Sequence, residues 1–291
     1  MNRLLWTAAM FLCLGTPCLA QIGGGGQGTD DHDDAAPTQV GYAVVTASSS
    51  ATGLTVMETF GLKVGTEINR AGFPSPELVT NASMFVDVSD RLARNLGVAM
   101  VNPGNTATSI TLTIRKSDGT QLASKTITLE GRRQTSQYIT ELVPVPPSQG
   151  GGIGGVTTPP IVEYTGTLSI TSTMPISVIG IPFRESKFST MPVTNVGTTT
   201  TPLPIFSSGV GGINAVLLPQ FAANGGWATQ IVVTNSNTSS ATVRVDLFAQ
   251  DGTALTAKMN GTSSSSFIGL IVPAGGALVL GPRDVNGDTR F

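Results

Sequence analysis

Apolar residues alternate with hydroxyl-bearing residues in short runs along most of the chain. In one run Ile110, Leu112 and Ile114 lie on one face, and Thr111 and Thr113 lie on the other. A period of two is typical of an antiparallel strand that buries one face. We therefore expect an all-β fold of antiparallel sandwiches. The same texture begins at residue 41 and predicts strands at 42–46, 54–59, 84–88, 96–101, 109–114, 124–129, 166–171, 176–181, 215–218, 229–234, 241–248, 267–271 and 277–280.

Helical periodicity is almost missing from the pattern. One helical turn is expected at residues 135–142, where Pro144 closes it. Strands do not alternate with helices, so the chain lacks the rhythm of a parallel α/β sheet that binds nucleotides. The glycine-rich runs at 23–26, 150–155 and 209–212 follow no strand-to-helix phosphate pattern, so we interpret them as linkers and turns.

The sequence contains an internal repeat at a shift of 133 positions. Asn102 falls on Asn235, and the Asp-Gly pair at 118–119 falls on the pair at 251–252 without any gap. Asp-Gly is a strong short-range signal for a β-hairpin turn. We call this pattern the front half of a unit. It predicts a strand, an asparagine turn, a second strand, an Asp-Gly turn and a third strand.

A second match, at a shift of 125 positions, aligns residues 41–50 with residues 166–175. We call this pattern the back half of a unit. One complete unit therefore lies in the middle of the chain, and an unmatched half lies toward each end. The halves follow the order back, front, back and front, at about residues 41–75, 80–145, 160–195 and 213–291.

Half of a sandwich leaves strand edges and an apolar face exposed, so we expect residues 39–75 to pair with residues 213–291. Within one molecule this pairing would give a circularly permuted second sandwich, and between molecules it would give head-to-tail self-association. Alternatively, the chain is a fragment of a larger repeat-array surface protein. The predicted organisation is a signal peptide at 1–20, a disordered Gly/Asp-rich tail at 21–38, back-half strands at 39–75, a complete sandwich at 80–195, a linker at 196–212 and a front half at 213–291.

The repeated turns and strands resemble those of a known kind of secreted protein. The front half has an N-P-G turn at 102–104 and a D-G-T turn at 118–120, and the back half reads G-T-L-S-I-T-S-T-M-P at 166–175. These motifs resemble secreted bacterial proteins that carry tandem Ig-like β-sandwich repeats and have no assigned function. The resemblance implies about two Ig-like sandwiches and a location at or outside the cell surface. It brings no catalytic residues with it.

The first twenty residues have the layout of a secretory signal peptide. Arg3 is followed by an apolar stretch from Leu4 to Leu14, and the segment ends on the small residue Ala20. The apolar stretch is shorter than the roughly 20 residues that span a bilayer, and a membrane anchor is the alternative interpretation. We expect secretion or a cell-surface location, with no transmembrane segment in the mature chain.

Both cysteines, Cys13 and Cys18, lie inside this predicted signal peptide. The mature chain would then form no disulfide, thiolate metal site or cysteine nucleophile. Extracellular eukaryotic sandwiches usually contain disulfides, so this pattern favours a bacterial secreted protein. Charged residues make up 12% of the chain and the net charge is −2, which provides no basic surface for nucleic acid.

Residue types that support catalysis are scarce in the sequence. The only histidine, His32, lies in the tail that is predicted to be disordered, where it cannot be held between a serine and an aspartate. Asp118 and Asp251 occupy hairpin turns, and no pair of carboxylates stands out for glycoside hydrolysis. We therefore expect a protein that is not an enzyme and that needs no cofactor.

One segment near the C-terminus suggests a Ca²⁺ site. Asp284, Asn286 and Asp288 place oxygen-bearing side chains at alternate positions, as the start of a Ca²⁺-binding loop does. The sixth position of such a loop should be glycine and is Thr289. A turn rich in Asp, Asn and Gly has the same composition without metal, so both interpretations stay open.

Two aromatic residues, Trp227 and Tyr42, each follow glycine and are candidates for stacking against a sugar ring. The alternative for both is to fill a core. The favoured function is a non-catalytic secreted or cell-surface module for adhesion, display or assembly, with a protein or glycan partner at the cell surface. The alternative is a carbohydrate-binding module that uses these aromatics on its rim.

Overall fold

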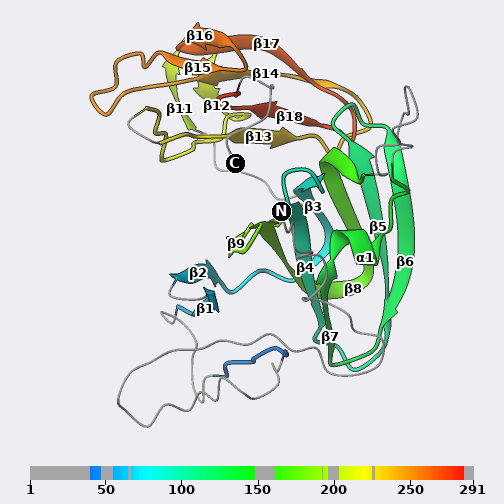
Figure 1. Cartoon of the computed structure of the whole chain (residues 1–291). Coiled ribbons are helices and arrows are strands. Elements are labelled where there is room, and N and C mark those ends of the chain that lie inside the picture. The colour runs from blue at the N-terminus through cyan, green and yellow to red at the C-terminus, as the bar shows by residue number, and fades with distance from the viewer. Residues whose placement is uncertain are drawn as a thin grey trace, which may run out of the picture.

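The structure is a computed structural model of the chain, shown in Figure 1. Nearly all of its elements are β-strands with antiparallel pairings, which confirms the predicted all-β fold of the sandwich class. The predicted signal peptide at 1–20 and the predicted tail at 21–38 lie outside the described residues. The structure describes residues 40–46, 55–64, 67–147, 161–191, 193–195, 203–224 and 227–284.

Residues 79–195 form one curled antiparallel sheet around a single core (Figure 1). The strand order is β10-β3-β4-β8-β5-β6, with β7 paired to β4 and β9 paired to β8. This central unit covers the range in which the sequence predicted a complete sandwich. Its elements are β3 (Val79–Ser89), β4 (Arg94–Asn102), β5 (Thr108–Lys116), β6 (Gln121–Leu129), β7 (Arg133–Tyr138), α1 (Ile139–Leu142), β8 (Glu163–Arg184), β9 (Lys187–Phe188) and β10 (Thr194–Asn195).

The long strand β8 joins the parts of this sheet. Its first part pairs with β3 and β5, so that Ile170 lies opposite Ala82 on one side and Leu112 on the other. From residue 177 onward it pairs with β4. The sequence predicted two separate strands over this range. The structure has one continuous strand, because the chain changes its pairing partners without leaving the sheet.

The core of the central unit follows from the period-two pattern. Ile110, Leu112 and Ile114 on β5 are fully buried, whereas Thr111 and Thr113 between them are partly exposed. Full burial of such an apolar side chain contributes about 1.5–3 kcal/mol. Other strands supply further apolar residues that are almost completely buried, among them Val86, Val98, Met100, Leu168 and Ile176.

The helical turn is shorter than the sequence predicted. Residues 135–138 belong to β7 and pair with β4, so only α1 is helical. The Glu141 carboxylate accepts a hydrogen bond from the Tyr138 backbone N–H at 3.3 Å, which caps the start of the helix. Pro144 follows soon after the end of α1, as predicted. Pairing with β4 outweighs the local helix preference of the first residues.

Residues 57–74 form a hairpin of β1 (Met57–Val64) and β2 (Glu67–Pro74), which pair with each other. The hairpin packs on the central unit near β9. The Phe60 ring stacks on the Phe188 ring with a centroid distance of 5.2 Å. Thr190 Oγ1 donates a hydrogen bond to the Gly72 carbonyl oxygen at 2.9 Å.

Within one molecule, the described part of residues 39–75 does not pair with residues 213–291 as the circularly permuted sandwich required, and pairing between molecules stays a prediction. Within the described residues, the hairpin lies against the central unit, and the C-terminal strands pair among themselves. The reason is local, because β2 ends only a few residues before β3 begins. The short connection keeps the hairpin beside the sheet that contains β3, where Phe60 reaches Phe188.

Within the described residues, the C-terminal unit consists of four two-stranded antiparallel sheets, β11–β12, β13–β18, β14–β17 and β15–β16. Its strands are β11 (Leu203–Ser207), β12 (Val210–Gly212), β13 (Ile231–Thr234), β14 (Ala241–Asp246), β15 (Ala257–Met259), β16 (Thr262–Ser264), β17 (Ser266–Val272) and β18 (Ala277–Leu280). The strand predicted at 215–218 is not formed, and part of the predicted linker at 196–212 forms the β11–β12 hairpin. A small core includes Ile231, Leu247, Met259, Phe267 and Leu280.

The two units meet at their turns. Thr167 Oγ1 on β8 donates a hydrogen bond to the Gly275 carbonyl oxygen at 2.8 Å. The Ala277 backbone N–H donates to the Ser117 carbonyl oxygen at 3.0 Å. The turn between β5 and β6 therefore docks on the turn between β17 and β18 and joins the central unit to the C-terminal unit.

Candidate assembly surface

The C-terminal unit repeats the turn chemistry of the central unit. Asn102 Nδ2 donates a hydrogen bond to the Thr106 carbonyl oxygen at 2.8 Å, and Asn235 Nδ2 makes the equivalent bond to Ser239 at 2.9 Å. Both asparagines are buried. The two Asp-Gly turns also form the same backbone hydrogen bonds. The repeat at 133 positions is therefore present in the structure as well as in the sequence.

Strand pairing in the two units follows the repeat, with the same register except that β14–β17 shifts by one residue between Val243 and Val245. Thr108 lies opposite Leu129 in β5–β6, and Ala241 lies opposite Val272 in β14–β17. The β13–β18 pair matches the β4–β7 pair in the same way. The second span is ten residues longer than the first, and the hairpin β15–β16 lies within it. The C-terminal unit is thus a second front half with one inserted hairpin.

The C-terminal unit lacks a counterpart of β8 among the described residues. In the central unit β5 lies between β6 and β8, and β4 pairs with both β7 and β8. In the C-terminal unit β14 pairs only with β17, and β13 pairs only with β18, within the described ranges. The edges that β8 covers in one unit are therefore without a strand partner in the other.

The missing strand changes how well equivalent apolar residues are buried. Ile110 and Leu112 on β5 are fully buried, whereas their equivalents Val243 and Val245 on β14 are only half-buried. Exposed large apolar side chains are also more frequent in the C-terminal unit than in the central unit. Of eighteen in the described residues, two lie in or next to the central unit, at Leu78 and Met174. Ten lie in the C-terminal unit, at Ile205, Phe206, Ile213, Val216, Leu217, Leu218, Trp227, Phe248, Ile268 and Ile271.

The outer face of β14 carries a self-contained ion pair. Arg244 Nε donates to both carboxylate oxygens of Asp246, at 3.0 and 2.8 Å, and Ser266 Oγ donates to the same carboxylate at 2.6 Å. Burial opposes the ionisation of Asp246, but these hydrogen bonds outweigh it and hold the pKa of Asp246 below its usual value of 3.8. The outer face of β14 therefore carries two charged groups, Arg244 and Asp246, and each is bonded to the other.

The remaining six exposed apolar side chains lie between residues 40 and 57, and three of them, Tyr42, Val44 and Val45, fall in the segment 41–50 that the sequence matched to residues 166–175 of β8. Residues 40–46 belong to no helix or strand. Val44 and Val45 are 76% and 70% exposed. The Tyr42 hydroxyl donates a hydrogen bond to the Arg132 carbonyl oxygen at 3.2 Å, which ties this segment to the central unit.

The two predicted ligand residues, Tyr42 and Trp227, lie in different parts of the molecule. Tyr42 is 44% exposed beside the turn that contains Arg132. Trp227 is 72% exposed on the C-terminal unit, where its backbone N–H donates to the Asn224 carbonyl oxygen at 2.9 Å. Neither side chain fills a core, and the two do not form a joint sugar-binding platform.

The predicted Ca²⁺ site falls mostly outside the described residues. Asp284 is described, whereas Asn286 and Asp288 are not. Within the described ranges, no group of three or more His, Cys, Asp or Glu side chains is arranged to hold a metal ion. The Ca²⁺ interpretation of this segment therefore stays a prediction.

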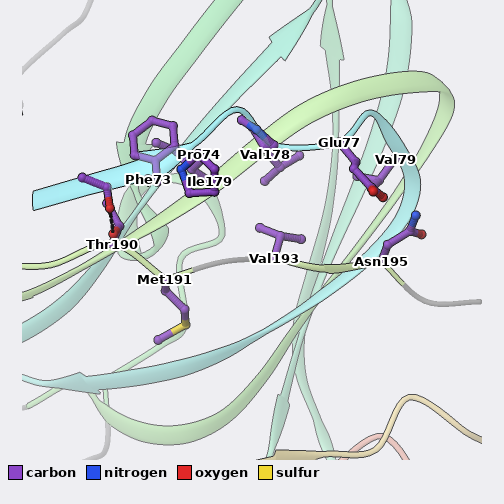
Figure 2. Close-up of a pocket in the computed structure, with 12 residues that line it drawn as sticks. Phe73, Pro74, Glu77, Val79, Val178, Ile179, Thr190, Met191, Val193 and Asn195 are labelled. Carbon is purple, nitrogen blue, oxygen red and sulfur yellow. Dashed lines mark hydrogen bonds between the residues drawn. The ribbon is translucent and has the colours of Figure 1, made fainter. Parts of the chain in front are cut away.

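An apolar groove of about 660 Å³ lies where β2 and the chain after it meet β8 and residues 190–195 (Figure 2). Phe73, Val178 and Met191 line it, and Glu77 is the one charged residue among the described residues that do so. A single carboxylate with apolar neighbours is unsuited to paired acid–base chemistry. The sequence did not reveal this groove, because its walls come from segments far apart in the chain.

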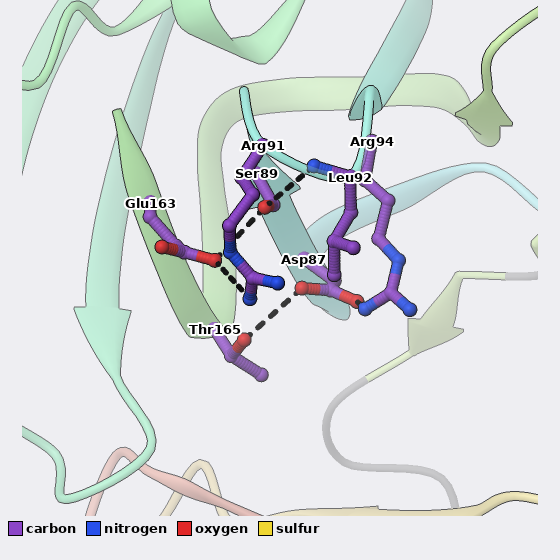
Figure 3. A network of polar contacts seen from close by, with 7 residues as sticks. All are labelled: Asp87, Ser89, Arg91, Leu92, Arg94, Glu163 and Thr165. Carbon is purple, nitrogen blue, oxygen red and sulfur yellow. Dashed lines mark hydrogen bonds and ion pairs between the residues drawn. The ribbon is translucent and has the colours of Figure 1, made fainter. Parts of the chain in front are cut away.

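A polar network at the β3–β4 turn holds two carboxylates close to β8 (Figure 3). Asp87 forms an ion pair with Arg94 at 3.0 Å and accepts a hydrogen bond from Thr165 Oγ1 at 3.0 Å. Glu163 accepts from Ser89 Oγ at 2.9 Å. Both carboxylates are engaged by donors from neighbouring strands. The network therefore fastens β3 to the start of β8.

Comparisons with models of known protein families, with curated proteins and with solved structures found no match to this chain. In the part of the chain that the structure describes, no helix is both long and apolar enough to cross a membrane. The open strand edges of the C-terminal unit and the exposed segment at 40–46 are therefore the features that bear most directly on function.

Proposed function

We propose that this chain is a non-catalytic β-sandwich protein that works outside a bacterial cell or at its surface, in adhesion, display or assembly. One observation carries the proposal. Exposed large apolar side chains gather on the C-terminal unit, which has a front half but no described strand equivalent to β8. A partner that supplies an extended strand would cover this surface.

The physical driving force for such binding is considerable. Burying one large apolar side chain contributes about 1.5–3 kcal/mol before the costs of association are subtracted. A strand added at the edge of a sheet also supplies backbone hydrogen bonds along its length. The half-buried Val243 and Val245 lie on the open strand and would gain most from this cover.

The arrangement of acidic groups supports a role other than catalysis. Asp87 and Glu163, the two carboxylates of the polar network, are engaged by donors that fasten strands together. The apolar groove has a single charged lining residue, Glu77, among the described residues. The adhesion, display or assembly role therefore needs no chemistry from these groups.

Hydrogen exchange on the full chain tests the open edge directly. In a dilute sample the amides of β14 should exchange faster than those of β5, which is its equivalent in the central unit and the internal control. Strand edges without partners are exposed to water, whereas β5 is paired on both sides. Equal protection of β14 and β5 in the dilute sample would contradict the proposal.

A carbohydrate-binding role is the second candidate, and the exposure of Trp227 favours it. A tryptophan ring that is 72% exposed can stack on a sugar without any rearrangement. Binding on a glycan array that is lost in Trp227→Ala and kept in Tyr42→Ala would support this role, since the two residues lie apart. No glycan binding by the intact chain would leave the assembly role as the better proposal.

A further inference from the structure

We infer that the open edge of β14 receives residues 41–46 of a second copy of this chain, so that copies join head to tail. This inference rests on the proposed function of the C-terminal unit as an acceptor of a strand. It adds the identity of the strand, the register of its pairing and the type of assembly.

The central unit contains the template for this pairing. There β8 lies along β5, with Ile170 opposite Leu112 and Leu168 opposite Ile114. All four side chains are buried. The C-terminal unit repeats the first part of β5, residues 108–113, as β14. The register toward the next strand is the same as far as Val243 and shifts by one residue between Val243 and Val245. An added strand would therefore meet on β14 the counterpart of residues 108–113, the part of β5 within which residues 110–113 pair with residues 169–172 of β8.

The sequence matches then give a specific register. The shift of 133 positions places Leu112 on Val245, and the shift of 125 positions places Ile170 on Val45. Val45 of one copy should therefore lie opposite Val245 of the next. The same two shifts place Val44 opposite Asp246, the last residue of β14. They place Ala43 and Tyr42 opposite Leu247 and Phe248, which follow directly after β14.

The side chains at these positions are compatible with the register. Val45 and Ala43 would point inward, in the places that Ile170 and Leu168 occupy in the central unit. Tyr42 and Phe248 are both partly exposed and would form an aromatic cross-strand pair.

The outward positions of the register are compatible as well. Val44 would lie opposite Asp246, which already pairs with Arg244 on the outer face. Residues 41–46 contain no charged residue. The pairing therefore buries no unpaired charge.

Figure 1 shows why the partner is another molecule. Residues 40–46, drawn in blue, lie at the opposite end of the picture from β14 and β17. The hairpin that follows in the chain is held on the central unit by the stacking of Phe60 on Phe188. The exposed segment at 40–46 and the open edge of β14 therefore lie apart in one molecule. A contact between unlike surfaces of two copies can continue into a chain of copies.

Sedimentation velocity of the full chain over a range of concentrations tests the inference. The intact chain should form larger species as its concentration rises. Val45→Asn should weaken this association at least tenfold, because it places an amide in the apolar interior. Val44→Asn is the matched control and should change association less than twofold, because residue 44 points outward. Both variants should fold, because residues 44 and 45 belong to no strand and their side chains are exposed.

Engineered cysteines test the register. In a chain with Cys13→Ser and Cys18→Ser, Val45→Cys combined with Val245→Cys should give a ladder of disulfide-linked multimers on a non-reducing gel. Val45→Cys combined with Val243→Cys is the control, two residues out of register, and should give little linkage. Equal linkage in both would overturn the proposed register.

The remaining outcomes separate this inference from the proposed function. A chain that stays monomeric at every concentration overturns the inference. A second outcome is that the chain associates and the β14 amides become protected with concentration, but Val45→Asn has no effect. A different strand then occupies the edge, so the inference falls and the acceptor role stands. If the chain associates and the β14 amides stay unprotected, both fall.

Discussion

At the scale of single residues, the buried polar side chains differ in how well they are bonded. Asn102 and Asn235 each donate to a carbonyl oxygen of their own turn and to one on the neighbouring strand, and each accepts a backbone N–H through Oδ1. A buried polar group without a partner costs about 1–3 kcal/mol, so these asparagines stabilise the turns by bonding the carbonyls. Tyr164 is the opposite case, because its hydroxyl is buried and has no hydrogen-bond partner among the described residues.

Tyr164→Phe should therefore leave the free energy of unfolding unchanged or raise it by up to about 1 kcal/mol. The ring keeps its place in the apolar core, and only the unsatisfied hydroxyl is removed. Urea unfolding near neutral pH measures the change. A loss of more than about 1 kcal/mol would show that the hydroxyl is bonded in solution.

The same substitution should alter the dependence of stability on pH. Burial raises the pKa of the Tyr164 hydroxyl above its usual value of 10.0, so the folded state keeps this proton after the unfolded state has lost it. The corresponding stability is complete below pH 10 and is lost as the pH rises further. Tyr164→Phe should lose less stability than the intact chain between about pH 8 and about pH 11. Tyr138 is present in both proteins, so the difference isolates Tyr164.

At the scale of elements, the two Asp-Gly turns show how one motif serves two purposes. Gly119 and Gly252 occupy the same turn position with φ of +87° and +81°. Added Cβ atoms would have different neighbours at the two sites. One on Gly119 would collide with the Ala274 carbonyl oxygen in the junction between the units, and one on Gly252 would meet nothing within 4 Å. The first turn is an interface, and the second is a free hairpin end.

Gly119→Ala should therefore destabilise the protein more than Gly252→Ala. Both substitutions force an alanine into the left-handed region, at a cost of about 1–2 kcal/mol. Gly119→Ala adds a backbone clash, for a total of about 2–4 kcal/mol. Urea unfolding of the two variants measures the difference. Equal losses would mean that the junction between the units does not persist in solution.

The elements also show what local pattern can predict. The period of two in residues 109–114 predicted a half-buried strand, and β5 has this alternation of buried and exposed side chains. The same reasoning divided β8 into two strands around Pro175, because proline and its neighbours interrupt the pattern. Pairing with β3 and β5 ends near this point and pairing with β4 begins, so the strand continues with new partners. No local signal specifies that change.

At the scale of the whole molecule, the two units are built with unequal cores. The central unit encloses many side chains that are completely buried, whereas the C-terminal unit has a smaller core with half-buried members. The units are joined through the turn contacts of Ser117 and Thr167. Unequal cores with a small junction favour separate unfolding of the units.

Thermal unfolding of the full chain should therefore show two transitions, with the C-terminal unit unfolding at the lower temperature. Binding to the folded state stabilises it by mass action, so the lower transition should move upward with protein concentration if copies pair at β14. Val45→Asn should remove this dependence and leave the upper transition unchanged. A single transition that is independent of concentration would contradict both the division into units and the assembly.

By itself, the sequence determined the all-β class, the positions of most strands and the repeat that relates β5 to β14, because these depend on side-chain alternation and turn chemistry within a few residues. It also predicted a strand at 42–46 within an unmatched back half, whereas residues 40–46 form no strand in the structure. Only the tertiary structure decided that the hairpin at 57–74 packs on Phe188, that Tyr42 and Trp227 lie apart, and that β14 has an open edge. Strand partners and surface exposure depend on contacts between residues far apart in the chain, which a local pattern does not encode.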